Sequence, residues 1–467
     1  MGANPEEVVI DAEGWDSVFG IWQQRVVLSG LTITGGYSDS WGGGIYLTSG
    51  DCRIDNCVVR GNQSQTMGGG LFIGMYAGGF AELNDCIIYE NYASEQGGGI
   101  FMTSQYGGCE VTATHCLISS NVSPIGAGIA ATVMSLELVD SVVADNVAES
   151  EGAGLGVGHY STGLLELDAE NCLFISNRTL DGTGGAAFVG LYATGFGARF
   201  SGSTFISNTA QDGGSALCAK TGENYSLPGV ELTDCIFRDG GSEIWEEQPG
   251  LVVVENSCIE GGWDGRGQGN FDADPLFVWG PLGDYYLSQM AAGQAVDSPC
   301  VDAGSMNAYS AGIAEKTTRT DGSPDTGIVD LGFHYPTLLM MPEVWVSTPS
   351  ETYSHGDTLE MVFEAINPNP FSYPVDLYAA VIGADGVIWT IDTGWVWSAS
   401  LDPWFASLEL PANFTFGPTT LLTLPIPSDL PPISASGTYW AAAAFAKVGT
   451  TSFIGEPSLS PFGLTAD

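Results

Sequence analysis

Three aspartates in one glycine-rich stretch are the residues best placed to bind an ion. The stretch TDGSPDTGIVDLG carries Asp321, Asp325 and Asp330, whose hard carboxylate oxygens suit calcium. Their spacing differs from that of an EF-hand loop, and aspartates also form turns by capping backbone amides. Both interpretations stay open. The sequence implies no required cofactor, with calcium as the one candidate ion.

Groups suited to acid–base catalysis are sparse and scattered. Hydrolases of polysaccharides place two carboxyl groups about 5 to 9.5 Å apart, and lyases need a basic residue beside calcium-bound carboxylates. Here the basic residues share no position of the repeat described below, and His115 and His159 have no matched partner. Asp272 and Asp274 form a second, less favoured acidic pair. The sequence therefore predicts that the protein is not an enzyme.

The chain is strongly acidic. Its 55 Asp and Glu residues against 11 Lys and Arg give a formal net charge of −44. Such a surface repels phosphate, which excludes a nucleic-acid partner and disfavours binding to anionic membranes. No apolar run is long enough to span a bilayer, so membrane insertion is not expected. Solubility explains the acidity most simply, and divalent-cation binding or a salt-rich habitat are the functional alternatives.

The elements that position these residues follow from a motif that recurs seven times between residues 31 and 218. Its marks are a small residue, an asparagine five residues later, and a glycine-rich turn. Equivalent positions lie 25 to 32 residues apart, which is typical of a stacked repeat architecture. The small residues are Cys57, Cys86, Cys116, Ser141, Cys172, Ser203 and Cys235, and the turns begin at Gly42, Gly68, Gly97, Gly126, Gly152, Gly184 and Gly213.

The repeat predicts a parallel β-solenoid. Its apolar pieces are four to six residues long, rich in Val, Ile, Leu and Phe, and bounded by turn formers, which is a strand pattern. Two or three strands fill one repeat, so each strand should pair with its copies at about 4.8 Å. Residues three before the small residue should face the interior, namely Ile54, Leu83, Ala113, Leu138, Ala169, Phe200 and Leu232.

Stacking in register predicts two ladders of like side chains. Free, buried thiols are expected at Cys57, Cys86, Cys116, Cys172 and Cys235. Corner asparagines with left-handed backbone, each passing amide bonds to the next, are expected at Asn62, Asn91, Asn121, Asn146, Asn177 and Asn208. The pairs to test for a disulfide are Cys52–Cys57 and Cys109–Cys116. Side chains that stack in parallel do not readily reach the dihedral angle that a disulfide requires.

This pattern, with its GGGI and GGGL turns, resembles the repeats of polymorphic outer-membrane proteins and the wider class of bacterial right-handed parallel β-helix repeat proteins. The segments DADPLFV, GDYYLS, SPCVDAGS and PDTGIVDLGFHY resemble the final coils of such secreted proteins. The resemblance covers residues 8–336 and implies the fold. It implies little about activity, because these repeats occur on many surface proteins without an assigned role.

A second domain is predicted over 338–467, after a first domain over 1–337. The repeat stops there, no cysteine follows Cys300, and short apolar runs such as EVWVS and GTYWAAAAFA alternate with turn signals. This pattern predicts an antiparallel, Ig-like β-sandwich. The NPNP run and DLYAAVIGADG resemble a C-terminal domain of secreted bacterial β-helix proteins. The fold class is therefore all-β, a right-handed parallel β-helix followed by a β-sandwich.

Three functional classes fit this architecture. The first is an extracellular or cell-surface structural protein, either an adhesin or a subunit that polymerises head-to-tail with itself. The second is a pectinase-like enzyme that cleaves polysaccharide, and the third is a module that binds cell-surface polysaccharide. A solenoid whose end is uncovered exposes strand edges that a second copy can pair with. A head-to-tail contact of this kind does not close and gives a filament. We therefore favour the first class.

Overall fold

The computed structural model describes residues 8–22, 25–48, 51–75, 79–104, 109–132, 135–158, 166–191, 197–222, 229–336, 343–354, 357–367, 373–382, 388–391, 397–398, 403–410, 414–425, 437–446 and 453–465. The chain divides into two compact units, and each is described by itself. The first comprises Met1–Val278 with Tyr285–Tyr335, and the second comprises Trp279–Asp284 with Pro336–Asp467. This division lies next to the boundary predicted between residues 337 and 338.

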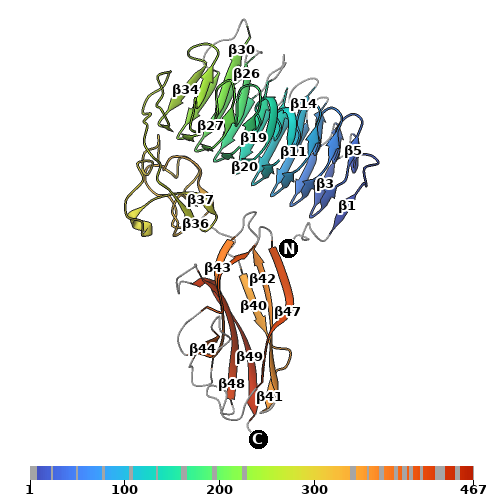
Figure 1. Ribbon diagram of the computed structural model, residues 1–467, viewed down its shortest axis with the longest axis vertical. Helices are drawn as coiled ribbons and strands as arrows, with labels where there is room; N and C mark the ends of the chain where they lie inside the picture. The colour runs from blue at the N-terminus through green and yellow to red at the C-terminus, as the bar shows by residue number, and fades with distance from the viewer. Residues whose placement is uncertain are drawn as a thin grey trace. The chain divides into compact units, whose positions relative to one another are not determined.

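The first unit is a parallel β-helix built from four sheets that run along the stack (Figure 1). Sheet 1 consists of β1 (Val9–Asp11), β4 (Thr32–Thr34), β8 (Val58–Arg60), β12 (Ile87–Tyr89), β16 (Leu117–Ser119), β20 (Val142–Ala144), β24 (Leu173–Ile175), β28 (Thr204–Ile206), β32 (Ile236–Arg238) and β35 (Cys258–Ile259). Sheet 2 consists of β2 (Phe19–Trp22), β6 (Ile45–Thr48), β10 (Leu71–Met75), β14 (Ile100–Ser104), β18 (Ile129–Ala131), β22 (Leu155–Val157), β26 (Ala187–Leu191), β30 (Leu217–Thr221) and β33 (Ile244–Glu246).

The other two sheets complete each coil. Sheet 3 consists of β3 (Val26–Ser29), β7 (Cys52–Asp55), β11 (Gly79–Asn84), β15 (Cys109–Thr114), β19 (Ser135–Val139), β23 (Glu166–Glu170), β27 (Gly197–Ser201), β31 (Val230–Thr233) and β34 (Val252–Glu255). Sheet 4 consists of β5 (Tyr37–Ser38), β9 (Gln63–Ser64), β13 (Tyr92–Ala93), β17 (Val122–Ile125), β21 (Val147–Glu151), β25 (Arg178–Thr179) and β29 (Thr209–Ala210). Within the described residues, β3 to β30 thus form seven coils of four strands each.

Register along the stack places like residues on like. Ile54 pairs with Leu83, which pairs with Ala113, and all three are nearly inaccessible to solvent. In sheet 1 the rings of Phe174, Phe205 and Phe237 stack with successive centroids 4.8 Å apart. The alternation of strands turns every second side chain inward, so one continuous core runs from Ile21 to Ile259.

Besides the left-handed glycine that begins each glycine-rich turn, such as Gly68 or Gly97, each coil has two further corners with a residue in the left-handed region. One such residue directly precedes the small residue of the motif and includes Asn56, Asp85, His115, Asp140, Asn171 and Asp234. The other directly precedes the ladder asparagine and includes Glu90, Ser120, Asp145, Ser176 and Ser207. The prediction that the ladder asparagines themselves are left-handed is therefore wrong. Their amides are committed inward to the ladder, and the residue before each one makes the turn.

The C-terminal end of the stack is covered. Residues 263–271 add a partial further coil, in which Val253 bridges Arg266 and Cys258 bridges Phe271 in parallel. The Val254 amide donates to the Arg266 carbonyl at 2.9 Å. As a result, the inward side chains of β34 have no solvent exposure.

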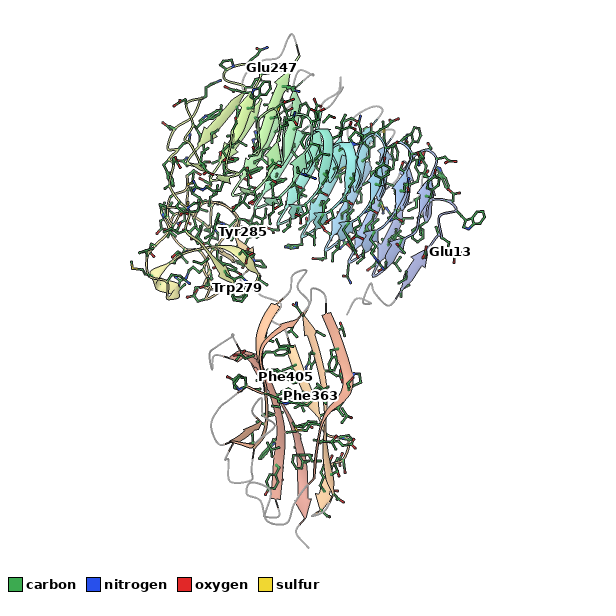
Figure 2. All side chains as sticks on the ribbon, viewed as in Figure 1. Glu13, Glu247, Trp279, Tyr285, Phe363 and Phe405 are labelled. Carbon is green, nitrogen blue, oxygen red and sulfur yellow. The ribbon has the colours of Figure 1, made fainter. Side chains whose placement is uncertain are left out.

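The N-terminal end differs. The end strands of the four sheets are β1, β2, β3 and β5. The Tyr37 amide of β5 donates to the Asp16 carbonyl at 3.1 Å, whereas no described residue pairs with the outer edges of β1, β2 and β3. Phe19, Val26 and Leu28 occupy interior positions opposite buried residues of the next coil but are only half-buried. Glu13, labelled in Figure 2, marks this end, and Glu247 lies near the other. Among the described residues, the first coil thus leaves part of its core uncovered.

After the last coil the chain forms the hairpin β36 (Phe277–Gly280) and β37 (Gly283–Leu287) and the 3₁₀ helix η2 (Met290–Ala292). It then returns along the corners of earlier coils. We call residues 298–335 the return segment. It contains β38 (Lys316–Thr317), which pairs with β39 (Tyr335–Pro336). The Gly332 amide donates to the Asp234 carbonyl, and the Phe333 amide donates to Thr204 Oγ1, each at 2.9 Å.

The second unit contains two sheets. One consists of β40 (Glu343–Ser347), β42 (Thr358–Asn367) and β47 (Phe414–Pro425), all antiparallel. The other consists of β41 (Thr352–Ser354), β49 (Phe453–Thr465), β48 (Gly437–Ala446), β43 (Tyr373–Ile382), β44 (Ile388–Ile391) and β45 (Trp397–Ser398), with β46 (Phe405–Leu410) also paired to β43. All its pairings are antiparallel except that of β41 with β49.

The core of the second unit forms between its two sheets. Phe363 of β42 packs against Trp404, with ring centroids 5.4 Å apart, and both are almost fully buried. Phe405, the next residue, turns outward and is 41% exposed; Figure 2 labels Phe363 and Phe405. Residues 368–370 of the predicted NPNP motif lie outside the described residues.

The predicted fold class is confirmed: a parallel β-solenoid is followed by antiparallel sheets. No helix among the described residues combines the length and apolar character needed to cross a bilayer.

Candidate functional site

The asparagine ladder is a continuous chain of amide hydrogen bonds inside the first unit. Asn121 Nδ2 donates to Asn146 Oδ1 at 3.0 Å and to the Ile88 carbonyl of the preceding coil at 2.9 Å. Its Oδ1 accepts from the backbone amide and the Nδ2 of Asn91. The same bonds join Asn62, Asn91, Asn121, Asn146, Asn177 and Asn208 in order. Every polar atom of these buried amides is used, so the ladder serves register and not ligand binding.

The last place in the ladder belongs to an aspartate that the sequence motif did not reveal. Asp239 Oδ1 accepts from the backbone amide of Asn208 at 2.6 Å and from its Nδ2 at 2.9 Å. Burial, together with the nearby charge of Glu243, raises the pKa of Asp239 well above its usual range. The motif spacing gave no signal for Asp239, because it lies four residues after Cys235, whereas each ladder asparagine lies five residues after the small residue of its coil.

The cysteine ladder is held by small hydrogen-bond donors. Cys86 Sγ donates to the carbonyls of Ile54 and Asn84, each at 3.3 Å. Ser141 takes the same place with its hydroxyl, which donates to the Val139 carbonyl and accepts from the Cys116 amide. This double role explains why serine and cysteine interchange at the position.

The described thiols are free and buried. All nine cysteines whose side chains the structure describes are free and buried, including Cys52, Cys57 and Cys116, so neither suggested disulfide is formed. The side chain of Cys109 lies outside the described residues. Burial raises the pKa of Cys52 to about 12 and that of Cys57 to about 11, which keeps these thiols protonated.

Of the three predicted calcium ligands, the fold brings two together. Asp325 and Asp330 gather with His334, and all three side chains are buried. His334 Nε2 lies 3.0 Å from Asp325 Oδ2, and its Nδ1 lies 2.8 Å from the Gly332 carbonyl. Asp321 instead faces Arg319, whose Nη2 is 2.6 Å from its Oδ2. We call Asp325, Asp330 and His334 the buried clasp.

Protein donors already occupy the carboxylates of the buried clasp. Asp330 Oδ1 accepts from the Asp302 amide at 2.7 Å, and its Oδ2 accepts from Gln289 Nε2 and the Thr318 hydroxyl. Asp325 Oδ2 accepts from the Asp330 amide at 2.9 Å. The N–H groups that point at these oxygens disfavour a cation beside them. Calcium needs six or more oxygen ligands, and the carboxylate oxygens here are engaged by protein donors. The donor set therefore favours the turn-capping interpretation, and calcium binding stays a prediction for titration.

The second acidic pair is also engaged locally. Asp272 Oδ1 lies 3.5 Å from Arg238 Nη1, and its Oδ2 accepts from the Gly261 amide. Asp274 Oδ1 accepts from the Leu276 amide at 2.9 Å. These contacts fix the chain where it leaves the last coil, and the two carboxylates accept hydrogen bonds from different backbone amides.

A charged cluster on the return segment was not predicted. Lys316 Nζ lies 2.5 Å from Asp140 Oδ1, and His115 Nε2 lies 3.4 Å from Asp140 Oδ2. Asn171 Nδ2 donates to Asp140 at 2.7 Å and to the His334 carbonyl at 2.8 Å. The side chains come from successive coil corners and from a segment far along the chain. In the sequence, His115, Asp140 and Asn171 each directly precede the small residue of successive repeats. Only this shared position could have predicted that they lie close together.

The charges of this cluster stabilise one another. Burial raises the pKa of Asp140, but hydrogen bonds from His115 and Lys316 outweigh it and lower the pKa overall. The hydrogen bond to Asp140 raises the pKa of His115, which is half-exposed. The cluster thus brings a carboxylate, an imidazole and an ammonium group together. His159, the other histidine singled out in the sequence, lies outside the described residues.

An aromatic row lies on the outer face of sheet 2 at the N-terminal end. Tyr46, Phe72 and Phe101 occupy successive coils in register, with ring centroids 5.4 and 5.5 Å apart. Trp41 stacks on Phe72 at 5.2 Å, and Trp22 contacts Tyr46 at 5.9 Å. Phe72 and Phe101 are buried, whereas Trp22 is 61% and Trp41 is 43% exposed. The exposed part of the row therefore borders the uncovered first coil.

Comparison with known proteins supports the fold. The family model described as a right handed beta helix region matches residues 13–143. The match spans under a third of the chain, and together with the parallel sheets it supports a right-handed β-helix fold for the first unit. No curated protein matches the chain.

One solved structure matches weakly. It is the Pseudomonas fluorescens alkylpurine DNA glycosylase AlkC bound to DNA containing an abasic site analog. The identity is 11%, the match covers 27% of this chain and 31% of that one, and the TM-score is 0.18. The chain thus spans about a third of the glycosylase, and the likeness carries no argument about fold or function.

Proposed function

We propose that the protein is a non-enzymatic structural protein of the cell exterior that associates with a second copy through its N-terminal coil. The observation that carries this proposal is the half-exposure of Phe19, Val26 and Leu28 at interior positions. At the opposite end, the equivalent residue Val254 has no exposure. Apolar surface left open at a strand edge is the feature by which β-proteins recruit another chain.

The two ends favour a particular mode of association. Because residues 263–271 cover the C-terminal coil, a head-to-tail contact requires that this covering be displaced. The N-terminal edges of β1, β2 and β3 meet no such obstacle among the described residues. Two identical edges can pair antiparallel about a two-fold axis, which closes the assembly as a dimer. We therefore favour the dimer, and the head-to-tail filament is the alternative.

Charge near the N-terminal coil makes the association dependent on salt. Glu13 and Asp16 are exposed close to the edge, and Arg25 is paired with Asp51 at 2.5 Å. Two such edges repel each other at low ionic strength. At physiological ionic strength, salt largely screens the repulsion between charges more than about 8 to 10 Å apart. The dimer fraction is expected to rise between low salt and physiological salt.

Light scattering after size-exclusion chromatography tests the proposal over a range of protein and salt concentrations. Leu28→Asp should shift the protein to monomer, because it places a charge on the half-buried edge. Leu180→Asp is the matched control, since Leu180 is exposed in the middle of the stack at 45%. A melting curve for each variant checks folding. A monomer at every concentration would overturn association, and rods in negative stain would replace the dimer with the filament.

The absence of catalysis is part of the same proposal. The carboxylates of the buried clasp accept hydrogen bonds from the protein, and Asp140 is bound by His115, Lys316 and Asn171. Such groups hold structure and are not poised to attack a bound sugar. Incubation with uronic-acid polymers should yield no shorter products, and any turnover would instead support a polysaccharide-cleaving enzyme.

A second candidate function is supported by the aromatic row. Trp22 and Trp41 expose ring surface, and aromatic rings of this kind stack on sugars. A net charge of −44 disfavours an acidic polymer, so a neutral glycan fits best. Calorimetric titration with a neutral β-glucan tests this. Trp22→Ala should abolish the heat, whereas Trp345→Ala, exposed at 40% in β40, should keep it.

A further inference from the structure

Two cysteines far apart in the sequence meet where the return segment covers the last coil. Cys258 lies in β35, the last strand of sheet 1, and Cys300 lies near the start of the return segment. Both are free thiols with no solvent exposure. They belong to one small apolar cluster with Ile236, Leu287 and Leu331, separate from the main core. The return segment is thus packed against the coil at these thiols.

The two thiols lie close enough to shift each other's pKa. The side-chain interaction with Cys300 lowers the pKa of Cys258, and the same interaction raises the pKa of Cys300 strongly. Cys258 Sγ also lies 3.1 Å from the Ala273 carbonyl, and the Cys300 amide donates to Ser298 Oγ at 3.1 Å. The two thiols are therefore neighbours within this apolar cluster.

The pair differs from neighbouring thiols of the cysteine ladder. Cys86 and Cys116 also interact, but parallel strands in register hold them one coil apart with parallel side chains. Each of them points its Sγ at two backbone carbonyls. Cys300 lies in a turn outside any strand, so its backbone is free of the register that keeps the ladder side chains parallel. A disulfide dihedral near 90° is accessible there and not in the ladder.

We propose that Cys258 and Cys300 form a disulfide that ties the return segment to the last coil when the chain folds in an oxidising compartment. That compartment follows from the proposed location outside the cell, but the test uses purified protein and does not depend on the location. The bond would act as a covalent lock that holds the return segment on the last strand of sheet 1.

The oxidation is a thiol–disulfide exchange with a low-molecular-weight disulfide such as oxidised glutathione. The Cys258 thiolate attacks one glutathione sulfur, which breaks the glutathione disulfide and releases one glutathione thiolate. The Cys300 thiolate then attacks the Cys258 sulfur and releases the second glutathione. Two protein thiols lose two protons and two electrons, and one glutathione disulfide becomes two glutathione molecules. Because both sulfurs are buried, the exchange takes place before the return segment has docked.

Refolding followed by peptide mapping tests the proposal. The chain is unfolded and reduced, and then refolded with a mixture of reduced and oxidised glutathione. It is denatured again in the presence of the alkylating reagent, so that buried free thiols react, and digested with proteases that cleave at Asp and Glu. Mass spectrometry should find a peptide pair that joins Cys258 to Cys300, with Cys86 and Cys116 alkylated. The proposal is overturned if Cys258 and Cys300 are both alkylated, or if Cys258 is joined mainly to a ladder cysteine.

Melting curves give a second readout. The oxidised chain should melt several degrees higher than the same chain after reduction. Cys116→Ser, which replaces a ladder cysteine by the residue found at Ser141, should keep this redox response. Cys300→Ala and Cys300→Ser should both lose it, and the use of two replacements guards against misfolding of one. An equal response to reductant in the Cys300 variants would overturn the assignment.

Discussion

At the residue scale, the molecule relies on buried polar side chains that are hydrogen-bonded within the protein. The ladder asparagines and the Cys and Ser donors bond to the backbone of a neighbouring coil, and the buried clasp bonds to the backbone of the return segment. Buried polar groups are costly when they lose their partners, so these positions specify one register among the many that a repetitive chain offers.

Asn121 tests the ladder most directly. Asn121→Ala removes the partner of the Ile88 carbonyl and of the Asn91 amide, both inside the stack. We expect the free energy of unfolding to fall by on the order of 3 kcal/mol or more, since each buried polar group left without a partner costs about 1–3 kcal/mol. Urea unfolding followed by circular dichroism measures the loss. Asn84→Ala is the control, because Asn84 is only half-buried and bonds to Asp55 at the surface. Equal losses in the two variants would contradict a special role for the ladder.

His115 tests the charged cluster through pH. Its pKa is raised in the folded state by Asp140, so its contribution to stability is complete below its ordinary value of 6.5 and is lost as pH rises through the folded value. The pKa of Asp140 is lowered, so its contribution is present above 3.8 and is lost as pH falls through the folded value. Asp85, Lys316 and Glu170 are the other charged groups near this pair.

We therefore expect the melting temperature of wild type to fall between about pH 6 and pH 8 more than that of His115→Asn. Asparagine is the suitable replacement because it is neutral and tolerates the left-handed backbone at this corner, where φ is 52°. The difference between the two profiles is expected to be small, because the imidazole is half-exposed. Profiles that run parallel over this interval would show that His115 contributes no linked protonation.

At the element scale, strands and coils could be predicted from the sequence, but the return segment could not. The repeat fixes which residues stack, so Ile54, Leu83 and Ala113 were placed inside by alternation alone. The left-handed corner was assigned one residue late, because the true corner residues vary among Glu, Ser, Asp and Gly and give no motif. His334 is hydrogen-bonded to Asn171, which lies 163 residues earlier in the sequence, and no spacing rule connects two such positions.

The docking of the return segment is tested at Asn171. Asn171→Gly removes the side chain that holds both the amide and the carbonyl of His334, and glycine keeps the left-handed corner, as Gly202 does one coil later. We expect faster hydrogen exchange at His334 and Phe333 with little change in β24. Asn56→Gly is the control, because Asn56 occupies the equivalent left-handed corner four coils earlier in the stack. Unchanged exchange at His334 would show that other contacts suffice.

At the scale of the whole molecule, charge opposes compaction. The chain carries a net charge of −44, and its first unit stacks acidic coils on one another. The described ion pairs are few and mostly at the surface, so they offset little of this repulsion. Hydrophobic stacking in register must therefore outweigh a repulsion that acts over the entire stack.

Added salt should accordingly stabilise the protein. We expect the melting temperature to rise with NaCl over the range in which the screening length shortens from about 30 Å to 8 Å, and to level off above it. Calcium chloride at the same ionic strength separates screening from binding. A calcium site would add a further rise that saturates with calcium and disappears in Asp325→Asn, whereas the hydrogen-bonded clasp predicts no such rise. Because the carboxylates there already accept N–H and O–H donors, we expect the two salts to act alike. A melting temperature that falls with NaCl would mean that ion pairs, rather than net repulsion, dominate the electrostatics of the fold.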